Sequence, residues 1–434
     1  MRRSPERIVQ SMRTADGEVY EGWWVVIAAG AVVMLIAGFF FYGFGTFFTE
    51  FQDEFGWTAA ATSIGFSLRS EVGGIAAPLV GWALDRYPPR RLLQAGLVVT
   101  AIGCAAMSAM QELWHFYVAM LFIATGNTAS GGQVGQYVVA TWFRQRRAFA
   151  ISLMTFGGAL GGALAALVAV IIEQIGWRST LRLMAVVLVI AAFSYGPRVR
   201  RRPEDHHQPL DGDATATQRA SDHEIPFREA IRSRAFALLN VATVCTDFVR
   251  VAFVVHVAAH IEIHLGGSKS YAGLALLAFA IASAPGRVIV GWFADRLRLR
   301  YVLAATMLPF CVGLPILALS TKPWHAMVAV LVIAPGFGGS IPLRAAIYAD
   351  YFGISVLGRV LGIGRLVSTT GGAIGAWVLG VVIDGSGYPN AWWLAFGLAA
   401  LAVPTSLFAT PPTGLQQEYA LAGDGADDAD QPNG

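Results

Sequence analysis

Charge is scarce in this chain. Charged residues make up 14% of its 434 residues, whereas a soluble domain carries about 25%. Apolar residues make up 55%, and mean hydropathy is +0.56. This balance excludes a soluble globular protein. Apolar runs of about 20 residues, long enough to cross roughly 30 Å of hydrocarbon, recur along the chain, so the sequence predicts an all-α membrane protein.

Cysteine is scarce too, and catalytic groupings are missing. Cys104, Cys245 and Cys311 each fall in an apolar run, which predicts buried side chains without a disulfide. No nucleophile stands beside a base, and neither polar segment is long enough for an appended sensor domain. We therefore expect no enzyme activity, no cofactor and no nucleic-acid partner.

Three histidines form the nearest approach to a metal site. His256, His260 and His264 recur every four residues, a spacing that places imidazoles on one helix face. No cysteine or aspartate-rich segment accompanies them, so we expect no metal and favour histidines at the membrane interface. His256 has a second interpretation, as a pH-sensing residue in a cavity.

Apolar segments predict twelve transmembrane helices. They are 22–48, 58–84, 92–111, 115–141, 148–174, 180–197, 235–263, 271–294, 301–320, 324–350, 359–384 and 390–410. The first run, from Trp23 to Phe48, is too long for the core of a signal peptide, so we expect it to be retained.

An internal repeat divides these helices into two sets of six. The sequence Gly81–Arg86 (GWALDR) returns 210 residues later as Gly291–Arg296 (GWFADR). Trp142-Phe143 before one glycine-rich run is echoed by Tyr351-Phe352 before another. Such repeats are typical of secondary transporters.

Arginine predicts the orientation. It is concentrated in the amino tail and in the loops after the even-numbered helices, which places both termini in the cytoplasm and the protein in the inner (plasma) membrane. The predicted organisation is a cytoplasmic tail (1–21), an N-terminal bundle (22–197), a cytoplasmic linker (198–234), a C-terminal bundle (235–410) and a disordered tail (411–434).

The repeated Gly-x-x-x-Asp-Arg pattern resembles the major facilitator superfamily. Pro285–Gly291 and the stretch from Tyr351 to Gly362 are similar to the branch of monocarboxylate transporters and oxalate–formate exchangers. The resemblance implies two pseudo-symmetric six-helix bundles around a central cavity, working by alternating access. It also implies that helices 3, 6, 9 and 12 lie outermost. We expect a monomer in the lipid bilayer.

Ionisable side chains inside the membrane are costly and mark function. The predicted helix interiors hold five cations and two anions: Arg69, Glu71, Asp247, Arg250, Arg287, Arg344 and Arg365. A water-filled cavity with this excess of positive charge attracts small anions.

Arg287 and Arg365 are the predicted substrate anchors. The resemblance implies that an arginine on helix 8 binds the substrate carboxylate, and Arg287 occupies that place; the alternative is a helix-end arginine reaching lipid headgroups. Arg365 lies at comparable depth on helix 11, and its alternative is pairing with an acid such as Asp350. The lysine of the exchangers falls on Ser368 in this chain.

Proton coupling has four candidate residues. Asp247 and Arg250 are three residues apart on one helix face, either as a titrating pair or as a structural one. Glu71 and His256 follow. The resemblance also implies a lysine in helix 1, but Lys269 and Lys322 are the only lysines, so the coupling mechanism does not transfer whole.

The remaining candidates concern gating and the cavity wall. Asp85, Arg86, Asp295 and Arg296 belong to the repeated motif and are predicted to form conformational gate contacts. The predicted cavity wall consists of Tyr42, Gln133, Gln136 and Tyr137, for which helix packing is the alternative.

The sequence therefore predicts a secondary carrier of small organic anions, monocarboxylates first, moved with a proton or by exchange. The competing transporter function is efflux of amphiphilic small molecules. Helix 5 lacks the Gly-Pro signature common in drug antiporters, which counts against that alternative.

Overall fold

The computed structural model describes residues 19–199, 203, 210–212 and 225–412. Most of the predicted amino tail, most of the predicted linker and most of the predicted carboxy tail lie outside these residues.

The described N-terminal half is mostly helical. Its elements are α2 (Glu21–Ile36), the π-helix η1 (Ala37–Tyr42), α3 (Thr46–Phe55), α4 (Ala59–Arg86), α5 (Pro89–Ser108), α6 (Leu113–Ser130), α7 (Gly132–Trp142), α8 (Arg147–Ile175) and α9 (Trp177–Ser194). Short 3-10 turns follow at Gly196–Arg198 (η2) and Leu210–Gly212 (η4).

The C-terminal half repeats this arrangement. Its elements are α11 (Phe227–Arg232), α12 (Arg234–Ala259), the π-helix η5 (His260–His264), α13 (Lys269–Ala294), α14 (Leu299–Ala305), α15 (Leu308–Ala318), α16 (Pro323–Phe352) and α17 (Leu357–Phe408).

Several predicted helices have limits that differ from those expected. The first is interrupted after Tyr42, where the π-helix ends with Gly43 N–H donating to Gly38 O at 2.9 Å. The last two are joined in α17, which turns at Gly387, where φ is +85°. Nine described helical segments are long and apolar enough to cross a membrane. α4, with its four charged residues, is not among them.

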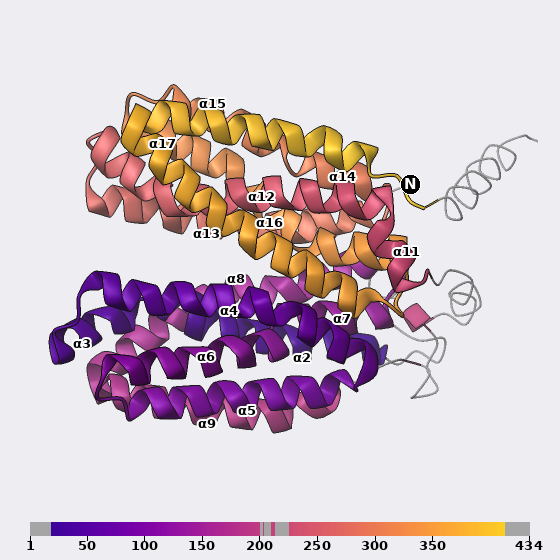
Figure 1. The fold of residues 1–434 in the computed structure, drawn as a ribbon, viewed down its shortest axis with the longest axis horizontal. Helices are drawn as coiled ribbons and strands as arrows, with labels where there is room; N and C mark the ends of the chain where they lie inside the picture. Colours follow the sequence, from indigo (N-terminus) through magenta and orange to yellow (C-terminus); the bar gives the residue numbers. More distant parts are fainter. Residues whose placement is uncertain (1–18, 200–202, 204–209, 213–224, 413–434) are drawn as a thin grey trace, which may run out of the picture.

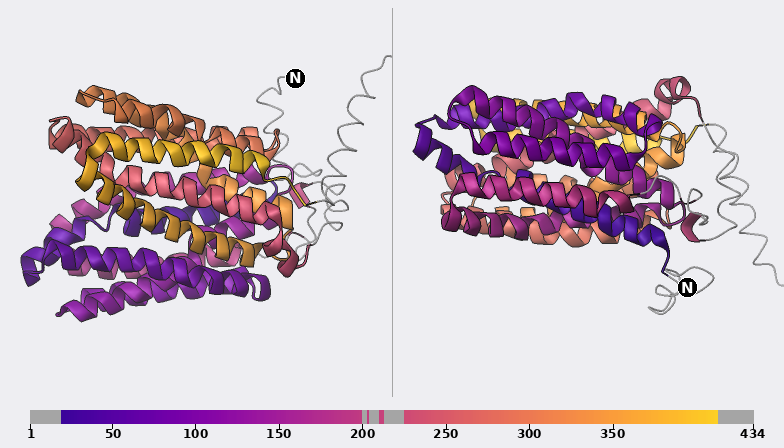
Figure 2. Two further views of the ribbon diagram at one scale, coloured as in Figure 1. Left: turned by 45° about the horizontal axis from the view of Figure 1, so that its top comes forward. Right: turned by 90° about the horizontal axis from the view of Figure 1, so that it is seen from below.

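The two halves lie side by side with their long helices along one common direction (Figures 1 and 2). α4 packs on α17 and α8 packs on α13 across the boundary between the halves. α5 and α9 lie on the far side of one half and α15 on the far side of the other, as the resemblance implied (Figure 1).

The halves are packed most tightly at the end where α4 and α13 finish and α11 lies, hereafter the linker end. A Cβ added to Gly81 would lie 2.2 Å from the carbonyl oxygen of Gly358, so only glycine allows α4 and α17 to approach this closely. The apolar core of the N-terminal half also continues into the segment from Leu343 to Leu361. The linker end is therefore closed.

Candidate functional site

A buried carboxylate organises the middle of the C-terminal half. Asp247 on α12 accepts a hydrogen bond from Arg250 Nη1 at 2.9 Å through Oδ1. Its Oδ2 accepts from Arg344 on α16 and from the Ser368 hydroxyl on α17. Asp247 is 5% exposed, so one carboxylate ties three helices together and leaves the Asp247–Arg250–Arg344 cluster with a net charge of +1.

Arg250 is held on its other side by an aromatic ring. Its guanidinium carbon lies 4.2 Å from the centre of the Phe337 ring, a cation–π contact that stabilises a desolvated guanidinium. The sequence predicted the pairing of Asp247 with Arg250. It assigned Arg344 no role, because no local pattern links residues 97 positions apart.

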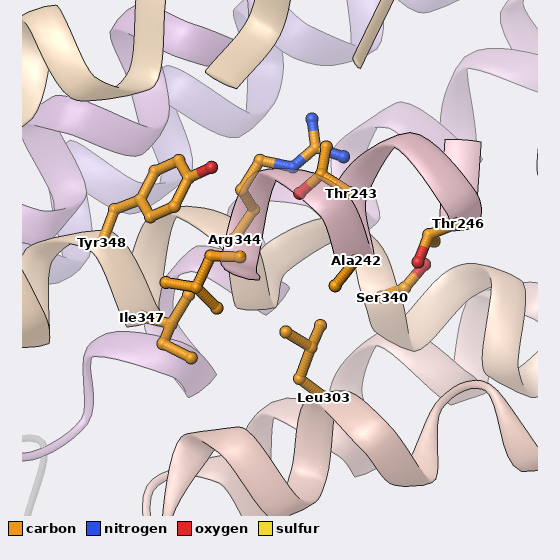
Figure 3. A pocket seen from close by; sticks show the side chains of 9 residues that line it. Ala242, Thr243, Thr246, Leu303, Ser340, Arg344, Ile347 and Tyr348 are labelled. Carbon is orange, nitrogen blue, oxygen red and sulfur yellow. The ribbon is translucent and has the colours of Figure 1, made fainter. Parts of the chain in front are cut away.

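A small cavity adjoins Arg344 inside the C-terminal half. It has a volume of about 20 Å³, room for about one water molecule. Figure 3 shows Arg344 and Tyr348 reaching toward Thr243 across it, with Ser340 and Thr246 on the opposite side. The cavity is lined by both polar and apolar side chains and is too small for an organic anion, so it offers room only for water beside the charged cluster.

Arg287 crosses the boundary between the halves. Its Nη1 donates to the backbone carbonyl of Thr155 on α8 at 2.6 Å, and the Tyr42 hydroxyl interacts with the same guanidinium. The side chain is buried, with 6% of its surface exposed. Arg287 therefore does not reach the lipid headgroups, and that alternative is wrong.

Arg365 occupies the other side of the charged cluster. It interacts electrostatically with Arg344 and Asp247, and Arg69 on α4 interacts with it from the opposite half. Its residue surface is exposed. Asp350, the acid proposed as its alternative partner, interacts with Arg147.

Two aspartates join the halves at the linker end in a reciprocal way. Asp85 on α4 accepts from the backbone N–H of Gly358 at 2.8 Å and of Arg359 at 3.2 Å, at the start of α17. Asp295, 210 residues later, accepts from Ala148 at 2.8 Å and Phe149 at 3.0 Å, at the start of α8. Each carboxylate thus satisfies free amides and faces the positive end of a helix in the other half.

The motif arginines behave differently from the motif aspartates. Arg86 lies 5.7 Å from the Trp82 ring centre, and Arg296 lies 3.6 Å from that of Trp292, whose carbonyl it also hydrogen-bonds. Within the described residues both guanidinium groups contact only their own segment. Asp85 also forms an ion pair across the boundary, because Arg359 Nε donates to it at 2.7 Å.

A third carboxylate, missed from the sequence, reaches the same place. Asp211 of η4 accepts from the backbone N–H of Arg144 at 2.9 Å and of Gln145 at 2.8 Å, in the turn before α8. Burial raises the pKa of Asp211. Burial also raises the pKa of Asp295 to about 7, against the opposing effect of its two amide donors. Asp211 therefore holds the turn before α8, and Asp295 holds the first turn of α8 itself.

The other predicted residues are dispersed. Tyr42 is 37% exposed beside Arg287. Gln133 donates to Ala77 O at 3.2 Å, which links α7 to α4. Gln136 is half-buried. Tyr137 is buried in the core of the N-terminal half, with 1% exposed, so its prediction as a cavity-wall residue is wrong and packing is the correct interpretation.

The remaining coupling candidates lie away from Asp247. Glu71 is exposed on α4. A ring nitrogen of His256 lies 2.9 Å from Ala376 O on α17. His260 is buried, with Nε2 2.8 Å from the Ser320 hydroxyl, and its ring stacks on His264. Among the described residues no group of three potential metal ligands comes together.

The sequence profile of the Major Facilitator Superfamily matches residues 30–258 and 239–424. The chain belongs to this superfamily. This Major Facilitator protein is therefore a multi-pass membrane transporter and not an enzyme, as the sequence predicted.

Similar proteins and a solved structure are consistent with membership in this superfamily. An MFS-type transporter of Gibberella moniliformis is 28% identical over 63% of this chain and 62% of its own length, so the chain spans just under two thirds of that relative. Monocarboxylate transporter 13 of Bos taurus is 27% identical over 85% of this chain and 84% of its own. The proton:xylose symporter XylE superposes with a TM-score of 0.70 at 13% identity, over 90% of this chain and 96% of XylE, which shows the shared fold.

Proposed function

We propose that this Major Facilitator protein is a secondary carrier of small organic anions, with monocarboxylates as the first class to test. The observation that carries the proposal is the positive excess in the membrane interior. Arg250 and Arg344 already share Asp247, and Arg287 and Arg365 add two further guanidinium groups near this cluster. A cavity with this charge attracts anions and repels cations, which disfavours the alternative of amphiphile efflux. The relative named monocarboxylate transporter 13 points to the same substrate class.

Arg287 is the proposed carboxylate anchor. A guanidinium presents two parallel N–H groups to a carboxylate, and this geometry is strong in a desolvated site. Arg287 has one N–H on the Thr155 carbonyl, while its buried Nε has no hydrogen bond. A substrate carboxylate would satisfy donors that the protein leaves open, with Tyr42 as a wall beside it.

The reciprocal aspartate contacts are the proposed gate. The arginine-rich linker end faces the cytoplasm on the positive-inside rule. Because Asp85 and Asp295 hold this end closed, both contacts must break before the carrier can open toward the cytoplasm. Substrate exchanges between the two sides as the halves rock about Arg287 and the Asp247 cluster.

The test is Arg287→Lys in proteoliposomes. Lysine keeps the charge but loses the planar fork, so we expect uptake of labelled lactate to fall at least tenfold with normal insertion and expression. Arg91→Lys, at an exposed site at the start of α5, is the matched control and should keep parental uptake. Lactate uptake by Arg287→Lys within twofold of the parent would remove Arg287 as the anchor.

A further inference from the structure

Arg344 lies between the central carboxylate and the small cavity of the C-terminal half. It donates from Nη2 to Asp247 Oδ2, and its side chain also lines the cavity of about 20 Å³ (Figure 3). Among the described residues, none accepts a hydrogen bond from its Nε or Nη1. The guanidinium is therefore held by the carboxylate through one nitrogen and keeps unused donors beside the cavity.

Four hydroxyl side chains line this cavity together with apolar ones, and two of them direct their protons to groups outside it. The Ser340 hydroxyl donates to the Phe337 carbonyl at 3.0 Å, and the Thr246 hydroxyl donates to Met307 Sδ at 3.4 Å. A carbonyl and a thioether can only accept, so in both contacts the hydroxyl is the donor. The oxygen lone pairs of Ser340 and Thr246 remain as acceptors for an N–H group.

Tyr348 supplies a third hydroxyl in a fixed position. Its side chain is fully buried, and a Cβ on Gly364 of α17 would lie 2.7 Å from Tyr348 Cε2, so glycine leaves the room that the ring fills. The hydroxyl donates to Asn240 Oδ1 at 3.5 Å, again to a residue outside the cavity lining. Arg344 and Tyr348 both reach toward the fourth hydroxyl residue, Thr243 (Figure 3). The cavity is thus rich in acceptors that suit a guanidinium.

The charged surroundings of Asp247 are cationic. The charged and titratable groups that face Asp247 or its partners are Arg250 on α12, Arg287 on α13, Arg344 and Tyr348 on α16, and Arg365 on α17. A proton that neutralises Asp247 removes the anion that holds Arg344. A buried guanidinium without its anion is costly, so it needs other acceptors close by.

We propose that the cavity is a second binding place for the Arg344 guanidinium, which moves into it when Asp247 takes up a proton. This inference rests on the proposed anion transport and assigns Arg344 as the residue that links protonation to it. A space for one water molecule also fits one NH₂ group of a guanidinium, which is of similar size. Tyr348 and Thr243 are the positioning residues that receive this group.

The step links the proton to the substrate through charge. One proton adds to a carboxylate oxygen of Asp247, and the Nη2–H···Oδ2 bond is exchanged for N–H···O bonds to hydroxyl oxygens. The Asp247–Arg250–Arg344 cluster then changes its net charge from +1 to +2. A substrate carboxylate restores +1, so the protonated carrier attracts the anion more strongly than the unprotonated one.

The experiment measures the pH dependence of transport. Initial rates of labelled lactate uptake into proteoliposomes are recorded from pH 5 to pH 8 for the parent, Arg344→Gln, Tyr348→Phe and Thr243→Val. Without Arg344, less positive charge holds the Asp247 anion, so we expect the pH of half-maximal uptake to rise by about one unit, a tenfold change in proton concentration. Without a cavity hydroxyl, the guanidinium has fewer acceptors and stays on Asp247, so we expect Tyr348→Phe and Thr243→Val to lower that pH by about 0.5–1 unit.

Opposite shifts separate this role from a merely structural one, which would lower the rate without moving the pH of half-maximal uptake. Tyr351→Phe is the matched control. Tyr351 lies on the same helix, is buried, and loses only the bond from its hydroxyl to Ala409 O at 2.9 Å, so this variant should keep the parental pH. Thr243→Val preserves the shape of the side chain and tests the proposal even where Tyr348→Phe does not fold.

Three results would count against the proposal or its basis. A parental pH of half-maximal uptake in the folded Tyr348→Phe and Thr243→Val variants overturns the second binding place, as does a downward shift in Arg344→Gln. Lactate uptake by the parent that does not depend on pH also overturns it and leaves the anion carrier intact. No lactate uptake by the parent at any pH overturns the proposed monocarboxylate transport itself.

Discussion

At the scale of single residues, Asp247 shows how the sequence and the structure divide the information. The three-residue spacing from Arg250 was sufficient to predict a pair on one helix face. The second arginine and the Ser368 hydroxyl come from α16 and α17, and no spacing rule reaches across 97 or 121 residues. Ser368 is also the position where the resemblance places a lysine, and here its hydroxyl contacts the central carboxylate.

Asp247 is the residue at which proton coupling is most directly tested. A substrate carboxylate that takes Arg250 would leave Asp247 with fewer positive partners and allow it to accept a proton. We therefore expect Asp247→Asn to abolish accumulation driven by a pH gradient while sparing substrate exchange, both measured in proteoliposomes.

The same Asp247→Asn variant also tests whether Asp247 stabilises the fold. Removing the charge leaves Arg250 and Arg344 without their shared anion, and breaking a buried ion pair costs about 3–5 kcal/mol. Thermal unfolding of Asp247→Asn monitors this cost. Gradient-driven accumulation that persists in a folded Asp247→Asn variant would exclude Asp247 as the coupling site.

At the scale of helices, the two aspartate contacts of the proposed gate are built in the same way. Asp85 caps α17 and Asp295 caps α8, and the 210-residue repeat relates both the aspartates and the amides that they accept from. The repeat alone predicted that these aspartates are conformational, but it also included Arg86 and Arg296, which stay on their own segments. The partners could not be predicted, because a backbone N–H at a helix start has no signature in residue type.

Asp85→Asn is expected to loosen the linker end. It removes the charge–helix interaction, typically 0.3–1 kcal/mol, and weakens the contact with Arg359 Nε. A cysteine introduced at Ser152, which is fully buried against Gly291, reports opening through its rate of maleimide labelling. We expect Asp85→Asn to increase that rate several-fold over the same reporter in the parent sequence. The parent without the added cysteine supplies the background, and an unchanged rate would show that Asp85 does not hold the gate.

We expect the Asp295 contact of the proposed gate to depend on pH. Burial raises its pKa from an ordinary value of 3.8 to about 7; Asp211 adds to the rise, while the two amides and Arg147 oppose it. A carboxyl with a higher pKa in the closed gate than in water binds its proton more tightly there. The closed state therefore gains stability as pH falls from about 7 toward about 4, and loses it as pH rises through 7.

The Ser152→Cys reporter tests this pH dependence, with each rate normalised to the unfolded variant at the same pH. We expect the accessible fraction to rise between pH 5 and pH 7, and Asp295→Asn to flatten the profile. A profile that keeps its slope in Asp295→Asn would assign the titration to another group, with Asp211 first to be examined.

At the scale of the whole molecule, hydrophobic runs and one repeat were enough to predict the fold. Each of the twelve predicted segments is helical over most of its length, and the superfamily profile covers most of the chain. The detail around single side chains was less predictable. Tyr137 looked like a polar group of a cavity wall and is packed in the core, because a tyrosine on an apolar helix satisfies either role. The interpretation of His256 as a pH-sensing residue stays a prediction; its ring nitrogen lies 2.9 Å from a backbone carbonyl of a neighbouring helix.

The most direct test of the central claim is transport itself. Proteoliposomes containing the parent protein are supplied with radiolabelled lactate, acetate, succinate or a labelled amphiphilic cation, with and without an inward proton gradient. The account predicts saturable uptake of carboxylates that Arg287→Lys suppresses, and no uptake of the cation above protein-free liposomes. Uptake of the amphiphilic cation together with no uptake of any carboxylate would contradict it.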